Sequence, residues 1–159
     1  VRGFSYPNGS YNREIIELLP KLGIEYSRIV GNTDDFSMPE NYLAWEATCH
    51  HNHNLIENGK RFLELKKTQY MYMMYVWGHS YEFNIYGNWD VMEEFCRNCG
   101  GRDDIWYATN IEIVDYMEAA GRLQFGAAGN MVYNPSAASV WIEVNGEKKE
   151  IQGGTLLEF

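Results

Sequence analysis

The stretch that decides the fold reads Met74-Tyr75-Val76-Trp77-Gly78-His79-Ser80-Tyr81-Glu82-Phe83. Its apolar and aromatic first half is typical of a buried strand. Gly78 ends that strand abruptly, and side chains capable of acid–base chemistry follow it. An α/β enzyme carries such side chains at the C-terminal tips of its strands, where loops meet the substrate. The alternative interpretation is a core strand followed by an ordinary polar loop.

Helix-type patterns alternate with strand-type patterns over the first 120 residues. Asn12 and Gly23 are suitable residues to begin and end the first helix. The alternation predicts a parallel sheet or a barrel-like α/β architecture. We expect helices over residues 12–22, 55–65, 89–99 and 110–120, and short strands at 24–30, 42–48, 70–77 and 105–108.

The pattern changes after Gly121 to short strands separated by turns. Asn145-Gly146 is a strong signal for a two-residue hairpin turn. We therefore divide the chain into an α/β part, residues 1–120, and a β-rich appendage, residues 121–159. Strands of the appendage are expected at 123–125, 131–133, 140–144 and 148–151.

The overall composition restricts the kinds of partner. The 159 residues carry a formal net charge of −9, which repels nucleic acid and anionic lipid. No apolar run reaches the roughly 18 residues that a membrane-spanning helix needs. We therefore expect neither nucleic acid nor a membrane as a partner. Twelve Tyr and five Trp fit either sugar-stacking surfaces or a large aromatic core.

The cysteines and the clustered histidines raise the question of a zinc site. Cys96 and Cys99 are two residues apart, and a His or Cys from Cys49-His50-His51 or His53 could complete a tetrahedron. A cysteine inside a helix, however, commonly serves as a small core side chain. A zinc pattern also normally contains a second matched pair. We favour core cysteines and surface-loop histidines.

Several short motifs follow one another in a fixed order along the chain: Phe4-Ser5-Tyr6-Pro7-Asn8-Gly9-Ser10-Tyr11-Asn12, Trp45-Glu46-Ala47-Thr48-Cys49-His50-His51, Gly78-His79-Ser80-Tyr81-Glu82-Phe83, Asn88-Trp89 and Ile105-Trp106-Tyr107-Ala108-Thr109-Asn110. This series resembles the polysaccharide deacetylase family (the family-4 carbohydrate esterases), especially a bacterial branch of short deacetylase-like proteins. The resemblance covers nearly the whole chain, and its specificity lies in the combination of motifs.

The resemblance implies a distorted (β/α) barrel that hydrolyses an N- or O-acetyl group of an acetylated carbohydrate. It also implies a divalent metal, usually zinc, that polarises the acetyl carbonyl and activates a water. In this comparison His79 matches the family's general acid. The Tyr6-Pro7-Asn8 loop matches the segment whose backbone helps to hold the oxyanion. Trp45 matches an aromatic residue that shapes the acetyl pocket.

Other side chains are candidates for supporting roles. Glu82 could orient His79 across a turn, and Arg28 could pair with a carboxylate near the site. The resemblance favours a sugar-facing position for one of the histidines at His50, His51 and His53. The structural alternatives are a solvent-facing Glu82 and a surface ion pair for Arg28.

The chain also departs from the family pattern. The family's Asp-Asp-Gly motif and its two metal-binding histidines a helical turn apart should both precede the Tyr-Pro loop, and this chain begins at that loop. No Asp-Asp-Gly occurs in the sequence. Ser5 stands where many members carry Arg, Asn8 where Tyr is usual, and Ala44 where Asp would precede Trp45. The chain thus looks like the C-terminal half to two-thirds of a deacetylase domain, and we do not expect it to bind the family's zinc by itself.

A partial barrel would leave an open sheet edge that needs a cover. We expect a homo-oligomer or a separate N-terminal segment, and a monomer seen by light scattering at micromolar concentration would contradict this. Two other interpretations stay open. One is a degenerate fragment without activity. The other is a non-catalytic carbohydrate-binding or interaction module, in which four aromatic residues hold a sugar: Tyr6, Trp45, Trp77 and Tyr81.

Overall fold

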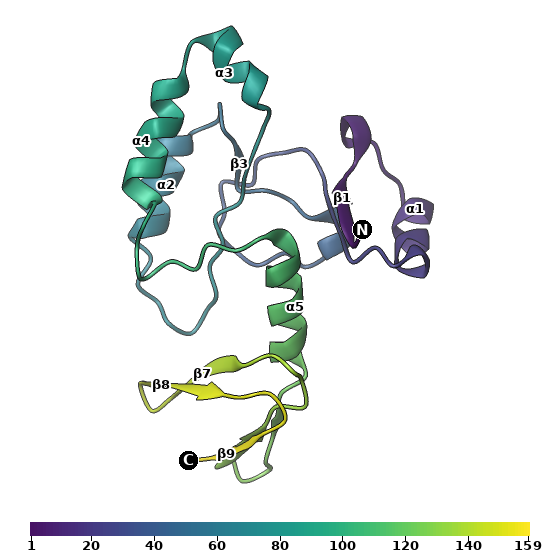
Figure 1. Cartoon of the computed structure of the whole chain (residues 1–159), viewed down its shortest axis with the longest axis vertical. Coiled ribbons are helices and arrows are strands. Elements are labelled where there is room, and N and C mark those ends of the chain that lie inside the picture. The colour runs from purple at the N-terminus through teal and green to yellow at the C-terminus, as the bar shows by residue number, and fades with distance from the viewer. The chain divides into compact units, whose positions relative to one another are not determined.

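The computed structural model describes residues 1–159 as two compact units, Val1–Tyr107 and Ala108–Phe159 (Figure 1). The chain is mixed α/β, with five α-helices and several small sheets, and no closed barrel is present. The division falls before helix α5 (Asn110–Gly121), whereas the sequence placed it after residue 120. Helix α5 groups with the C-terminal strands because it packs against strand β7 (Val140–Val144). None of the helices has the length and apolarity that crossing a membrane requires.

Four short strands of the first unit run parallel. Strand β1 (Gly3–Ser5) pairs with β2 (Tyr26–Arg28), and β3 (Cys49–His50) pairs with β4 (Val76–Trp77). An isolated parallel bridge between Arg28 and Trp45 connects β2 to the segment that leads into β3. The strands therefore follow one another in chain order. This agrees with the predicted parallel pairing, but β1 and β3 were not predicted as strands, and β2 and β4 are shorter than the strands predicted at 24–30 and 70–77.

Helices make the connections between the paired strands, as the alternation predicted. Helix α1 (Arg13–Leu18) and the 3₁₀ turn η2 (Leu19–Leu22) lie between β1 and β2 in the chain, and α2 (Leu55–Leu63) lies between β3 and β4. The side chain of Asn12 accepts the backbone N–H of Ile15 at 2.9 Å, and Gly23 ends η2 with a left-handed φ of 74°. Both predicted caps of the first helix are confirmed.

Two predicted strands are wrong, and one helix was missed. Residues 42–48 begin with a 3₁₀ turn, η3 (Tyr42–Ala44), because the Asn41 side chain accepts the backbone N–H of Leu43. Residues 105–108 form no strand, since the Tyr107 hydroxyl donates to the carbonyl of Cys99 and ties this segment to the preceding helix. Helix α3 (Ser80–Tyr86) follows β4 almost directly, where the sequence suggested a loop.

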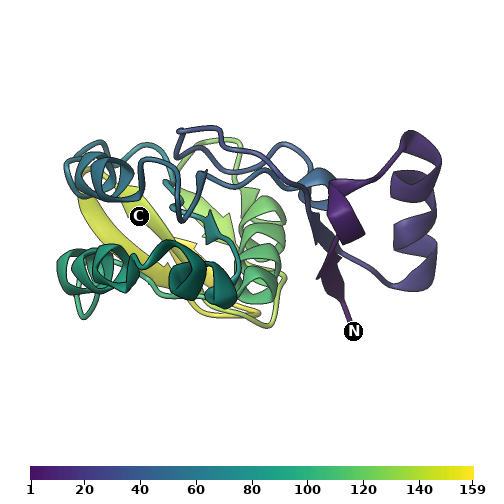
Figure 2. The same cartoon turned by 90° about the horizontal axis from the view of Figure 1, so that it is seen from above.

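Helices α2 and α4 (Trp89–Cys99) pack side by side (Figures 1 and 2). Gly59 lies at their contact, where an added β-carbon would lie 3.1 Å from the ring of Phe95 and 3.4 Å from Sγ of Cys99. The glycine that weakens α2 locally therefore allows the close approach of α4. Cys99 is buried here and Cys96 is exposed. The core interpretation is therefore confirmed for Cys99 and wrong for Cys96, whose side chain reaches solvent.

The second unit combines α5 with antiparallel strands. Thr109 and Glu112 form a capping box at the start of α5. Asn145 and Gly146 have positive φ values of 53° and 82°, as expected for the predicted hairpin turn. This hairpin joins β7 to β8 (Glu147–Ile151). The other sheet has the order β5 (Gln124–Phe125), β6 (Met131–Tyr133) and β9 (Leu156–Glu158), of which β9 was not predicted.

Candidate functional site

Three histidines surround one glutamate oxygen in the first unit. Oε2 of Glu82 lies 3.1 Å from Nε2 of His50 and 2.9 Å from Nε2 of His51. The same oxygen lies 3.2 Å from Nδ1 of His79 and accepts the backbone N–H of His79 at 2.9 Å. We call His50, His51, His79 and Glu82 the histidine–glutamate cluster. All four were candidates from the sequence, but their meeting at one atom was not foreseen.

The parallel pairing of β3 and β4 brings this cluster together. Parallel strands present their C-terminal ends at the same edge of a sheet, so His50 and Trp77 end side by side. The backbone N–H of His51 donates to the carbonyl of Trp77 at 2.9 Å and extends the pairing by one residue. Helix α3 then turns the chain back, so that Glu82, three residues after His79, faces the two histidines.

Close packing fixes the two neighbouring histidines. The His51 ring is 3% exposed and lies 4.2 Å from the ring of Phe83, while the His50 ring lies 4.5 Å from that of Trp77. Gly78 has a φ of 149°, and a β-carbon built on it would lie only 1.8 Å from Cδ2 of His51. The glycine that ends the strand in the sequence is thus needed to admit the His51 ring.

The cluster stabilises the ionised form of Glu82. Burial alone would raise the pKa of this carboxyl, but hydrogen bonds from His51 and from the backbone and side chain of His79, with the nearby His50, lower it to about 2. Burial lowers the pKa of His50, and repulsion from His51 adds to this effect, while Glu82 opposes both. The cluster thus combines a negative carboxylate with a half-buried imidazole, His50, whose charged form is disfavoured.

The hydrogen bonds also indicate where the imidazoles carry their hydrogens. The backbone N–H of Asn52 donates to Nδ1 of His50 at 3.2 Å, which assigns the hydrogen of neutral His50 to Nε2, facing Glu82. His79 uses Nδ1 toward Glu82, and no hydrogen bond occupies its Nε2. The His79 side chain is 51% exposed, so its Nε2 is open to a ligand from solvent.

The other predicted site residues fall into exposed and buried sets. Tyr81 is exposed, and its ring lies 5.3 Å from that of His79. Pro7 and Asn8 are exposed on the 3₁₀ turn η1 (Pro7–Gly9). The sequence suggested that Arg28 pairs with a carboxylate, either near the site or at the surface, and both predictions are wrong. Its guanidinium lies instead 4.4 Å above the Trp77 ring.

Tyr6 and Trp45 are core residues in this structure. The Tyr6 hydroxyl donates to the carbonyl of Leu43 at 2.7 Å, and its side chain belongs to the hydrophobic core. Trp45 is completely buried, and its ring packs edge-on against Tyr26, Tyr42 and Tyr75. Neither side chain offers a surface to a sugar here, so we do not include them in the site.

A second group of hydrogen-bonded polar side chains, which the sequence did not suggest, contains the remaining histidine, His53. Oδ2 of Asp34 lies 2.8 Å from Nε2 of His53, and Oδ1 accepts from the amide of the buried Asn58 at 2.7 Å. Arg61 donates to the backbone carbonyl of Asp34 at 3.2 Å. These hydrogen bonds, first from Asn58 and then from His53, lower the pKa of Asp34 against the opposing effect of burial. His53 is therefore separate from the histidine–glutamate cluster.

We expect Asp34→Asn to remove a pH-dependent part of the stability. Because the pKa of Asp34 is lowered on folding, its contribution is present above about pH 4 and is lost as the pH falls through the folded-state value. The effect should be about 1 kcal/mol or less, since the pair with His53 is over a third exposed and solvent screens it. Urea unfolding of both proteins at pH 7 and pH 3 measures it. A constant difference between them across this range would contradict the prediction.

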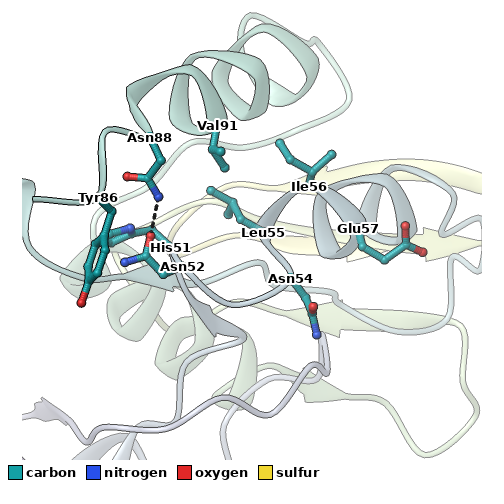
Figure 3. Close-up of a pocket in the computed structure, with 9 residues that line it drawn as sticks. All are labelled: His51, Asn52, Asn54, Leu55, Ile56, Glu57, Tyr86, Asn88 and Val91. Atoms are coloured by element: carbon teal, nitrogen blue, oxygen red, sulfur yellow. Dashed lines mark hydrogen bonds between the residues drawn. The ribbon is translucent and has the colours of Figure 1, made fainter. Parts of the chain in front are cut away.

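An open groove of about 530 Å³ lies beside His51 (Figure 3). Polar amides and apolar side chains line it together, and the amide of Asn88 donates to Oδ1 of Asn52 at 2.8 Å across it. Its lining residues are His51, Asn52, Asn54, Leu55, Ile56, Glu57, Tyr86, Asn88 and Val91.

The two polar groups differ in how far they can be predicted from the sequence. Glu82 lies three residues after His79, a spacing that allows contact once a helix forms, so its role could be proposed. Asp34 has a left-handed φ of 51° in an irregular loop, and no local pattern pairs it with His53 or Asn58. In comparisons with protein-family models, curated proteins and solved structures, nothing matches this chain.

Proposed function

We propose that this chain forms part of a hydrolase that removes an acetyl group from acetylated carbohydrate, as its resemblance to the polysaccharide deacetylases implies. The observation that carries the proposal is the pairing of His79 with the ionised Glu82 at the tip of β4. The proposed general acid is thereby held by a carboxylate through one ring nitrogen and left open at the other. This is the arrangement that acid catalysis by an imidazole requires.

In the proposed step, water adds to the acetyl carbon, and Nε2 of His79, which no hydrogen bond occupies, takes the proton that the water loses. The bond from the acetyl carbon to the sugar nitrogen or oxygen then breaks, so that acetate and the free sugar amine or hydroxyl are released. His79 gives the hydrogen on Nε2 to the departing nitrogen or oxygen. Glu82 does not touch the substrate. As a positioning residue it accepts from Nδ1 of His79, orients the ring and stabilises the imidazolium form.

The order of the strands supports the finer assignment of the fold. Parallel strands that follow one another in chain order and are joined through helices are the repeating unit of a (β/α) barrel. The first unit has β1 beside β2, β2 bridged to the segment before β3, and β3 beside β4. We therefore propose a partial, distorted barrel of the deacetylase type, with residues 108–159 as the appendage.

The groove and the aromatic residue near the cluster support a sugar substrate. The groove shares His51 with the cluster, and its volume of about 530 Å³ is ample for a sugar unit. Exposed Tyr81 lies against His79 and could stack on a sugar ring. If the chain binds sugar without hydrolysing it, Tyr81 is the aromatic residue that favours this second function, since two of the four first suggested are buried.

This chain lacks the ligands with which the deacetylase family binds its metal. Asp-Asp-Gly and a pair of histidines four residues apart are not in the sequence. We assign no carboxylate of the chain as the catalytic base, and the proposed step uses only His79, which both accepts and gives the proton, and Glu82. The family's site and its base would have to be formed by another segment or another chain.

The proposal is tested by acetate release from an acetylated chito-oligosaccharide, with and without added zinc. We expect release above the protein-free rate, and Glu82→Gln should lower kcat by about 100-fold with little change in KM, because a displaced His79 is misaligned. A parallel NMR titration with the same sugar detects binding without hydrolysis. Binding that shifts the signals of Tyr81 and His79 without acetate release would favour the sugar-binding alternative. If the chain neither binds the sugar nor releases acetate, both proposed functions are overturned.

A further inference from the structure

We propose that His50, His51 and Glu82 bind a divalent transition metal such as zinc. Nε2 of His50, Nε2 of His51 and Oε2 of Glu82 lie within 4.8 Å of one another. The two contacts to Glu82 measure 3.1 and 2.9 Å. In a tetrahedral zinc site with bonds of about 2.0–2.1 Å, neighbouring ligand atoms are about 3.3 Å apart. The two measured contacts are thus already close to the edges of a zinc tetrahedron.

The ligand types point to zinc rather than to calcium or magnesium. Two imidazoles with one carboxylate are a known ligand set of catalytic zinc, which leaves the fourth position open. Imidazole suits zinc, copper, iron and nickel, whereas calcium and magnesium prefer oxygen ligands alone. These ligands differ from the set that the deacetylase resemblance implies, because His50 and His51 lie at the end of β3 and Glu82 lies in the first turn of helix α3.

The protein holds these ligands in place before any metal arrives. Phe83 and Gly78 enclose the His51 ring, and Trp77 supports that of His50. His79 contacts the same oxygen of Glu82 at 3.2 Å, so its ring lies beside the proposed metal position.

Metal binding would replace the hydrogen bonds from His50 and His51 to Glu82, and it should also disturb one hydrogen bond outside the site. To bind through Nε2, His50 must carry its hydrogen on Nδ1, where the N–H of Asn52 now donates at 3.2 Å. Two donors cannot face each other, so the Asn52 amide has to move away. This predicts a local change of the turn after β3, which a site formed by other residues would not cause.

Zinc titration of the chain by calorimetry tests the proposal independently of any acetate release. We expect one zinc per chain and a loss of affinity of at least about 100-fold in Glu82→Gln and His51→Gln. The matched control is His53→Gln, which removes the histidine bound to Asp34 and should leave the affinity unchanged. Because His51 is buried and its variant could unfold, the half-buried His50→Gln gives a second test of the ligands.

The NMR signal of the Asn52 amide gives a readout on the unchanged protein. Zinc should shift it at the same stoichiometry that calorimetry finds. The proposal is overturned if the unchanged chain binds no zinc, if Glu82→Gln binds zinc as well as the original, or if His53→Gln weakens binding equally. Zinc binding without acetate release would leave this site standing and count only against the proposed hydrolase.

Discussion

Replacing His79 by Gln should reduce acetate release by about 10²- to 10⁴-fold, the usual contribution of a general acid. Glutamine can accept and donate hydrogen bonds, but it cannot transfer a proton at neutral pH. The side chain is half exposed and lies outside the core, so the fold should survive the change. The measurement is the rate of acetate release from an acetylated chito-oligosaccharide, with circular dichroism to confirm folding.

His53→Gln is the matched control for this experiment. It makes the same chemical change at a histidine that contacts Asp34 rather than Glu82. Its rate of acetate release should stay close to that of the unchanged chain. If His79→Gln and His53→Gln release acetate at equal rates, His79 is not the general acid.

The second large effect is expected in the C-terminal unit, at Asn134. This side chain is completely buried, and its amide donates to the carbonyls of Ala138 at 2.8 Å and Ile151 at 3.0 Å. Its oxygen accepts the backbone N–H of Ser136 at 3.0 Å. Asn134→Ala should lower the free energy of unfolding by about 2–4 kcal/mol, because several buried backbone groups lose their partner at once.

Urea unfolding followed by circular dichroism measures this loss, and Asn130→Ala serves as the control at an exposed position. Asn134→Asp separates the effect of the two donated hydrogen bonds from that of the accepted one. It keeps an acceptor for Ser136 but replaces the two donated hydrogen bonds with a carboxylate that faces carbonyl oxygens. It should therefore be no more stable than Asn134→Ala. If all three variants unfold alike, Asn134 does not hold the unit together.

Local patterns were enough to predict several elements. Asn12 begins and Gly23 ends the first helical segment, and Asn145-Gly146 forms the hairpin turn. These features were predictable because each cap or turn depends on the conformational preferences of one or two residues. Parallel pairing also followed from the alternation of helices and strands. The exact extent of the strands did not, since strand length depends on partners far away in the chain.

What the sequence by itself determined is therefore the alternation of helices and strands, most of the helices, and the chemistry available after β4: a glycine, a histidine and, three residues on, a glutamate. Only the tertiary structure decided which residues meet there. Pairing of β3 with β4 brings His50 and His51 to Glu82, whereas His53 contacts Asp34, which lies in an irregular loop. It also buries Trp45 and Tyr6, which the sequence offered as sugar contacts. The physical reason is that local preferences act over a few residues, whereas burial and hydrogen bonding between distant residues are settled only when the strands pack.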